Sequence, residues 1–384
     1  MTRYRKRKLR TIVNFCVLVM VPVAAAGAAR VIPEAGMAMR ELGSIRLDKE
    51  SPEYDTVEAK LTHGSAVSQV SGDMVISQGY GWREEKETLP TGEVVLPEPM
   101  EMVSDSPGEK PYPVQWGEGG AVVRTTYGEY SGDSFFDLDS CGQVNNKTEH
   151  SNAELLEESR ELPAFTISDT TEPQVLIYHT HTTESFEPFV RESCDDTFNY
   201  RTTDDTKNVV MVGDAIQAEL EAAGIGVIHA RTIHDYPSYN GSYSRSRETI
   251  VPILEEYPTI KVALDIHRDA VSGEGFITQP YAEIGGKEAA QVMIISGCDD
   301  GTLGMPEYMK NFHFACALQQ QLEGDWKGLT RPILFDYRHY NQDLTTGSLL
   351  IEVGSHGNTL SQVQWSGQLI GRSLGKLLNG MKEN

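Results

Sequence analysis

Continuous apolar runs after Pro173 predict a buried sheet. Runs of this kind, rich in Val, Ile and Leu, are typical of strands that are covered on both faces. They occur at 174–181, 225–230, 261–267, 291–296 and 348–354.

Between these runs, apolar residues recur every three or four positions, as on one face of a helix. The segment 208–223 places Val212, Ile216 and Leu220 at this spacing, and Gly224 follows as a stop signal. Further helices are predicted at 244–257, at 305–325 and after Asn358 or Thr359, the last with Val363, Ile370, Leu374 and Leu377 on its apolar face. The alternation predicts an α/β domain over 173–384, an open and mostly parallel sheet with helices on both faces.

The N-terminus has a different pattern. Residues 11–29 are nineteen uncharged, largely apolar residues, and residues 1–10 carry six basic side chains. A helix of that length spans roughly 28 Å, close to the thickness of a bilayer core. We expect a single transmembrane anchor with a cytoplasmic basic tail and the rest of the chain outside. The small residues of 24–29 also suit a signal peptidase, and export follows in either case.

Residues 30–172 are rich in Glu, Pro, Gly and Ser, and their apolar residues are scattered. We therefore expect a weakly ordered extracytoplasmic linker, with short strands near 121–127. The whole chain has a formal net charge of −23, which argues against nucleic acid as a partner. Its five cysteines include no CxxC pair and define no disulfide framework.

Polar side chains that can bind metal gather at the ends of three predicted strands. His179, His181 and Glu184 follow the first, His267 ends the third, and Glu352 lies in the fifth. In such sheets the ligand site lies at the carboxyl ends of the strands. Two imidazoles and a carboxylate, with water in the fourth position, form a catalytic zinc site, and a second carboxylate serves as base. Glu352 fits the role of base, because a charge inside an apolar strand is costly without a function or a partner.

Several assignments remain open. His179 and His181 are two apart and would share a face of an extended strand, so either one is a candidate ligand. Glu187 lies near Glu184 in the sequence, and either glutamate could instead be a capping residue or a surface residue of a loop. Three more residues are candidates for supporting a ligand or contacting substrate: Asp265, which shares a face with His267, Arg268, which alternatively forms a structural salt bridge, and the loop residue His356.

Three segments resemble one known family. VLIYHTHTTESF, VALDIHRDA and LLIEVGSHGNTL are similar, in order and separation, to blocks of the stage II sporulation protein P family, which is related to the zinc-dependent N-acetylmuramoyl-L-alanine amidases. The resemblance covers about 172–381 and the basic, single-spanning N-terminus. In the broader amidase group the glutamate ligand comes later, on a helix, so Glu184 would be a local replacement.

The resemblance implies a membrane-anchored Zn²⁺ hydrolase whose catalytic domain lies between the mother-cell and forespore membranes. Its substrate would be peptidoglycan, cut between N-acetylmuramic acid and L-alanine, with stem-peptide crosslinks as a second target. The implied role is septal wall thinning and forespore engulfment, with stage II sporulation proteins D and M as partners. The alternative is a catalytically inactive wall-binding or scaffolding protein. The sequence has no GxSxG nucleophile elbow, which argues against a serine hydrolase.

Overall fold

The computed structural model describes residues 119–168, 170, 172–195 and 197–382, together with the backbone of three short strands, β1 (Val75–Ile76), β2 (Thr88–Leu89) and β3 (Gly92–Glu93). The predicted basic tail and membrane anchor, residues 1–29, lie outside the described part. None of the helices in the described part is both long enough and apolar enough to cross a bilayer.

An eight-stranded sheet organises the domain. Its strand order is β5-β6-β14-β13-β15-β9-β7-β8. Neighbours run parallel except β5 with β6 and β13 with β15, so the prediction of a mixed α/β fold with a mostly parallel sheet is confirmed. The strands are β5 (Phe135–Asp137), β6 (Gln143–Asn146), β7 (Pro173–Tyr178), β8 (Gly226–His229), β9 (Val262–Asp269), β13 (Val292–Cys298), β14 (Ile333–Tyr337) and β15 (Gly347–Ser355).

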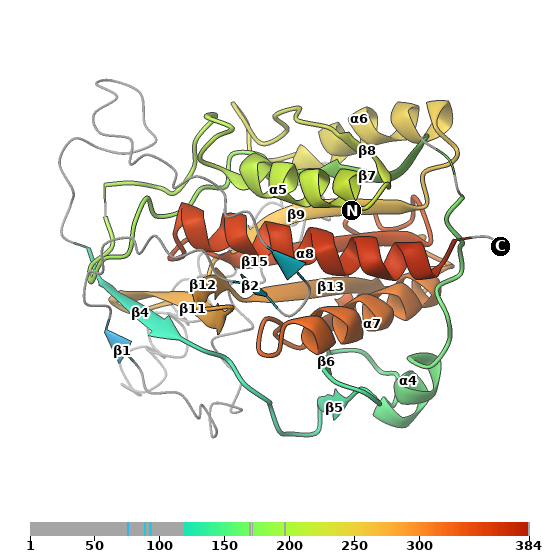
Figure 1. Cartoon of the computed structure of the whole chain (residues 1–384), viewed down its shortest axis with the longest axis horizontal. Helices are drawn as coiled ribbons and strands as arrows, with labels where there is room; N and C mark the ends of the chain where they lie inside the picture. The colour runs from blue at the N-terminus through green and yellow to red at the C-terminus, as the bar shows by residue number, and fades with distance from the viewer. Residues whose placement is uncertain are drawn as a thin grey trace, which may run out of the picture. The chain divides into compact units, whose positions relative to one another are not determined.

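Helices cover both faces of this sheet. Helices α5 (Val209–Ala222), α8 (Leu360–Gly380) and α7 (Tyr308–Asp325) lie side by side over one face (Figure 1). They enclose the larger core cluster, which includes Leu264, Ile266 and Ile351. Helix α6 (Ser242–Glu256) covers the other face, where Ile250 packs with Leu176 and Tyr178.

Two helices begin where the sequence places capping residues. The Asn208 side chain accepts a 2.9 Å hydrogen bond from the backbone N–H of Val210 at the start of α5. Thr359 and Gln362 form a reciprocal capping box at the start of α8. Both caps satisfy backbone donors that a helix N-terminus otherwise leaves unpaired.

A second sheet follows the path β1-β4-β11-β10, and β12 pairs with β11. Its remaining strands are β4 (Ala121–Thr125), β10 (Ser272–Gly273), β11 (Phe276–Ile284) and β12 (Lys287–Ala290). Gly285 and Gly286 join β11 to β12 with φ of 62° and 74°, as a tight hairpin turn requires. The sequence interpretation missed this hairpin although the Gly-Gly pair signals it.

The ordered part begins before the predicted boundary at 173. Strand β4 confirms the short strand that was predicted near 121–127, but β5, β6 and helix α4 (Asn152–Glu158) come from a segment that was expected to be a weakly ordered linker. Within it Val122, Val144 and Leu155 are fully buried in the main core cluster. Residues 121–158 therefore belong to the folded domain, while the rest of the 30–172 assignment lies mostly outside the described residues.

Candidate metal centre

His267 and Glu352 come from neighbouring strands. They are direct partners in the parallel ladder of β9 and β15. Because side chains alternate along a strand, Asp265, His267 and Glu352 leave the face opposite to that of Leu264, Ile266 and Ile351. The candidate centre thus lies on the α6 face of the sheet, towards the carboxyl ends of β7 and β9.

His181 and Glu184 reach the same place from a turn. Strand β7 ends at Tyr178, and residues 180–183 form turns. Glu184 Oε1 lies 3.7 Å from His181 Nδ1, and its Oε2 lies 3.6 Å from His267 Nδ1. His181, Glu184 and His267 are all buried, and each offers a ligand atom within 4.8 Å of the others.

The geometry of this cluster fits zinc. Ligand atoms at about 2.0–2.1 Å from a tetrahedral ion are separated by roughly 3.4 Å, close to the observed 3.6 and 3.7 Å. Within the described residues, His181 Nε2 and Glu352 Oε2 are buried without a hydrogen-bond partner, whereas His267 Nε2 faces Asp265. Unpartnered buried polar atoms are rare in folded proteins, and two in one cluster indicate that a ligand belongs there.

His179 is not part of the cluster. Its Nδ1 lies 2.9 Å from the carbonyl oxygen of Ile266, and its Nε2 lies 2.8 Å from His229 Nε2. A Cβ on Gly213 of α5 would come within 2.5 Å of that His229 nitrogen, so glycine leaves space for the histidine pair. The expectation that His179 and His181 share a strand face is wrong, because the chain turns after Tyr178.

Asp265 is placed to orient a ligand. Its Oδ1 lies 2.8 Å from His267 Nε2, without the alignment of a hydrogen bond. The same carboxylate accepts hydrogen bonds from the backbone N–H of Thr180 at 2.8 Å and from its hydroxyl at 2.6 Å. A carboxylate behind a metal-binding histidine would have this geometry, so the supporting role predicted for Asp265 is compatible with its position.

Burial and neighbouring charges shift the pKa values of the cluster. Burial, together with the charges of His267 and Arg201, lowers the pKa of His181 well below its usual range. Burial also opposes a charge on His267, but Asp265, Glu184 and Glu352 outweigh it and raise its pKa to about 9. Burial and the nearby Asp269 raise the pKa of Glu352 to about 8. A carboxyl group with such a pKa is suited to accept and return a proton near neutral pH.

Arg268 and Asp269 connect the centre to the protein frame. The Arg268 backbone N–H donates to Glu184 Oε2 at 3.0 Å, and its guanidinium donates to the carbonyl oxygens of Ser185 and Tyr200 at 3.0 and 3.1 Å. Asp269 forms a buried ion pair of 2.8 Å with Arg331. The guanidinium thus bonds to backbone carbonyl oxygens, and the backbone N–H bonds to the Glu184 carboxylate; the salt bridge that the sequence suggested for Arg268 stays a prediction.

The other two candidates differ in their surroundings. His356 is buried beside Tyr200, with ring centroids 5.2 Å apart, and its Nδ1 has no hydrogen-bond partner among the described residues. Glu187 instead pairs with Arg191 at 2.7 Å and accepts a 2.7 Å hydrogen bond from the Tyr200 hydroxyl. Glu187 is therefore a structural residue, and Glu184 is the glutamate that faces the two histidines.

Three residues near the cluster carry no signal that the sequence interpretation used. The Tyr239 ring stacks on His181 at 4.6 Å, and Tyr243 contacts the rings of both His181 and His267 at 5.5 and 6.4 Å. The Arg201 guanidinium lies 4.7 Å above the Tyr239 ring. Tyr239 and Tyr243 lie in and just after the loop that follows β8, where the carboxyl-end rule would have directed attention.

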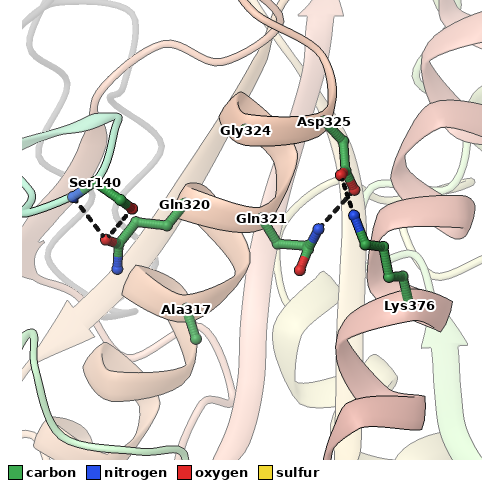
Figure 2. Close-up of a pocket in the computed structure, with 7 residues that line it drawn as sticks. All are labelled: Ser140, Ala317, Gln320, Gln321, Gly324, Asp325 and Lys376. Atoms are coloured by element: carbon green, nitrogen blue, oxygen red, sulfur yellow. Dashed lines mark hydrogen bonds and ion pairs between the residues drawn. The ribbon is translucent and has the colours of Figure 1, made fainter. Parts of the chain in front are cut away.

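A separate hollow lies on the helical side of the domain. It is lined by Ser140, Ala317, Gln320, Gln321, Gly324, Asp325 and Lys376 (Figure 2). Its polar groups bond to one another: Ser140 Oγ donates to Gln320 at 2.6 Å, and both Gln321 and Lys376 donate to Asp325 at 2.7 and 2.5 Å. The hollow shares no residue with the candidate centre.

Sequence comparison finds one family and a curated relative. The model of the family described as "Stage II sporulation protein P (SpoIIP)" matches residues 131–375. Stage II sporulation protein P of Bacillus subtilis (strain 168) is 30% identical over 201 residues. That alignment covers 50% of this chain and 47% of the relative, so the chain spans about half the length of the protein it matches.

Solved structures with some similarity include two amidases. N-acetylmuramoyl-L-alanine amidase AmiC2 of Nostoc punctiforme has 11% identity and a TM-score of 0.34, over 55% of this chain and 98% of that one. The CwlD amidase from Clostridioides difficile, solved in complex with the GerS lipoprotein, has 12% identity and a TM-score of 0.35, over 54% and 99%. TM-scores this low support no conclusion beyond the sequence match.

Proposed function

Because the chain belongs to the stage II sporulation protein P family, we propose that it is a zinc-dependent peptidoglycan hydrolase. The bond it cleaves is the amide between N-acetylmuramic acid and the L-alanine of the stem peptide, and stem-peptide crosslinks are a second class of substrate. The observation that carries the proposal is the buried group His181, Glu184 and His267 with Glu352 beside it.

In this proposal His181, Glu184 and His267 hold the metal, and Asp265 fixes the ring of His267 from behind. Zinc held there supplies Lewis acidity towards a water molecule and towards the carbonyl group of the amide. The low pKa of His181 keeps its imidazole neutral, the form that binds metal, whereas His267, with a pKa of about 9, must release a proton as the ion binds.

Glu352 performs the proton transfers. Its carboxylate accepts a proton from the attacking water as the new C–O bond forms. The same proton then passes to the nitrogen of L-alanine as the C–N bond breaks, so that the stem peptide leaves as an amine and the muramic acid retains a carboxylate. Burial excludes bulk water from this carboxylate, which is 5% exposed.

The proposal also concerns the setting of the enzyme. Residues 11–29 anchor the chain in the membrane, and residues from 30 onward face the space between the mother-cell and forespore membranes. There the enzyme thins the septal wall during engulfment, together with stage II sporulation proteins D and M. Family membership supports this setting.

Mass spectrometry of the fragments released from defined peptidoglycan by the full-length protein tests the reaction. Amidase activity produces free lactyl carboxylates on muramic acid and stem peptides that begin with L-alanine. Products cut only inside crosslinks would replace the amidase assignment by an endopeptidase. A zinc-loaded protein that releases nothing would support the scaffolding alternative.

A further inference from the structure

A loop outside the three family-like segments reaches into the candidate centre. Asp235, between β8 and α6, accepts hydrogen bonds from the backbone N–H of Thr183 at 3.0 Å and from its hydroxyl at 2.6 Å. The Asp235 side chain is 0% exposed. Thr183 lies between His181 and Glu184, so this contact fixes the backbone that joins two candidate ligands.

A second buried carboxylate holds the other end of this segment. Asp265 binds Thr180 through the same two donors, backbone N–H and hydroxyl, at 2.8 and 2.6 Å. The turn that carries His181 is therefore fixed by a buried carboxylate on each side. Such a turn has no strand ladder of its own to hold it, so these side-chain bonds replace the ladder.

Arg201 joins Asp235 to the ligand segment. Its Nη1 donates to Asp235 Oδ2 at 2.7 Å, and its Nη2 lies 3.7 Å from Glu184 Oε1. The next residue, Thr202, donates its backbone N–H to the Thr183 carbonyl at 2.7 Å. The positive guanidinium compensates the negative charge of Asp235. A carboxylate at 0% exposure is strongly destabilising when it has no such partner.

The loop that carries Asp235 is itself held from behind. Arg245 of α6 donates to three carbonyl oxygens of this loop: His234 at 2.6 Å, Ser238 at 2.6 Å and Asn240 at 3.0 Å. One planar guanidinium thus holds the loop both before and after Asp235. Asp235 is consequently presented to Thr183 from a rigid support.

We propose that Asp235 is a positioning residue for the metal ligands, acting through Thr183 to set the separation of His181 and Glu184. The inference rests on the proposed zinc function. Residues behind the ligands of a metal site contribute to affinity because they hold the ligands in the binding geometry before the ion arrives. Without the hydrogen bonds to Asp235, the turn must become ordered when the ion binds, and this entropic cost lowers the affinity for zinc.

The test is the zinc affinity of the full-length protein, freed of metal and titrated in competition with a chromophoric chelator. We expect Asp235→Asn to weaken zinc binding by about 10- to 100-fold. Thr183→Val, which removes only the hydroxyl donor, should weaken it less, and Thr183→Ser should restore it. The absorption bands of the Co²⁺-substituted protein should change in Asp235→Asn, because they report ligand geometry, which a purely structural loss of stability would not alter.

Asp300→Asn is the matched control. Asp300 accepts hydrogen bonds from the same two donors of a threonine, the backbone N–H and hydroxyl of Thr302 at 2.9 and 2.5 Å, but locally on an exposed turn, so zinc affinity should not change. Asp235→Asn with wild-type affinity and an unchanged cobalt spectrum would overturn the inference alone, provided that the wild type binds zinc and cleaves peptidoglycan. A wild type that binds no zinc would overturn the proposed function as well. If Asp235→Asn does not fold, the Thr183→Val and Thr183→Ser pair decides: equal affinities overturn the inference.

Discussion

Glu352 lies beside His267 across the parallel ladder of β15 and β9, and both side chains leave the same face of the sheet. Glu352 Oε2 is buried without a hydrogen-bond partner among the described residues. A buried carboxylate without a partner, next to a candidate metal ligand, is suited to exchange a proton with a molecule bound beside it.

Glu352→Gln should reduce turnover by about 10²- to 10⁴-fold, because the amide keeps the shape of the side chain but cannot accept the proton. Zinc content should remain at the wild-type level, since Glu352 is not one of the three clustered ligands. Release of soluble fragments and metal analysis of the same preparation measure both quantities. Glu283→Gln, at an exposed position of β11, is the control. Turnover above a tenth of wild type would remove Glu352 from the role of base.

His181→Ala and His179→Ala should have different effects. His181→Ala should abolish stoichiometric zinc binding, because it removes a ligand. His179→Ala should retain zinc but lower the free energy of unfolding by about 2–4 kcal/mol, because it leaves the Ile266 carbonyl and His229 without their buried partner. Metal analysis and denaturant unfolding measure these effects. The reverse pattern would make His179 the ligand.

Acid should destabilise the metal-free protein partly through His356. Burial, together with the charge of Arg268, lowers the pKa of His356 to about 3, whereas an unfolded histidine has a pKa of about 6.5. Below pH 6.5 the unfolded chain binds a proton that the folded protein does not, so the free energy of unfolding falls as the pH falls towards 3. By pH 5 this single group should cost about 2 kcal/mol relative to pH 7.5. Denaturant unfolding of the wild type and of His356→Gln at both values is the measurement; equal losses in the two proteins would contradict the prediction.

A chain that starts at residue 119 should fold, whereas one that starts at 174 should not fold stably. The shorter chain lacks β4, β5, β6 and α4 and exposes the apolar surface that Val122, Val144 and Leu155 cover. Each such side chain contributes about 1.5–3 kcal/mol on burial. Thermal unfolding followed by circular dichroism compares the two. A cooperative transition of the 174–384 chain at the same temperature would show that residues 119–173 are dispensable.

The core strands were predictable because they are long and apolar. The segments that form β7, β9, β13 and β15 are continuously apolar, as strands buried on both faces must be, so they are predicted as strands without knowledge of their tertiary contacts. Direction is a different matter: nothing in the residues of β13 indicates that it runs antiparallel to β15. Strand β14 was missed because Pro332 directly precedes its short apolar run and Asp336 interrupts it.

The candidate centre was predictable in part. His267 and Glu352 follow from strand alternation, and the structure brings them together as expected. The choice between His179 and His181 depended on where β7 ends, and the chain leaves the extended conformation one residue before His179. Asp235 carries no such signal, because a loop carboxylate is identified as a partner of Thr183 only when the chain is folded.

The candidate ligands and base are distant in the sequence and meet only when β9 is flanked by β7 on one side and β15 on the other. Contacts of such long range carry a high entropic cost of loop closure, so they form late in folding. A chain that has paired β7 only with β8 has His181 and Glu184 but neither His267 nor Glu352 in place beside them. Competence to bind metal therefore requires that β7 and β9 have paired, and folding intermediates without this pair should not bind the ion.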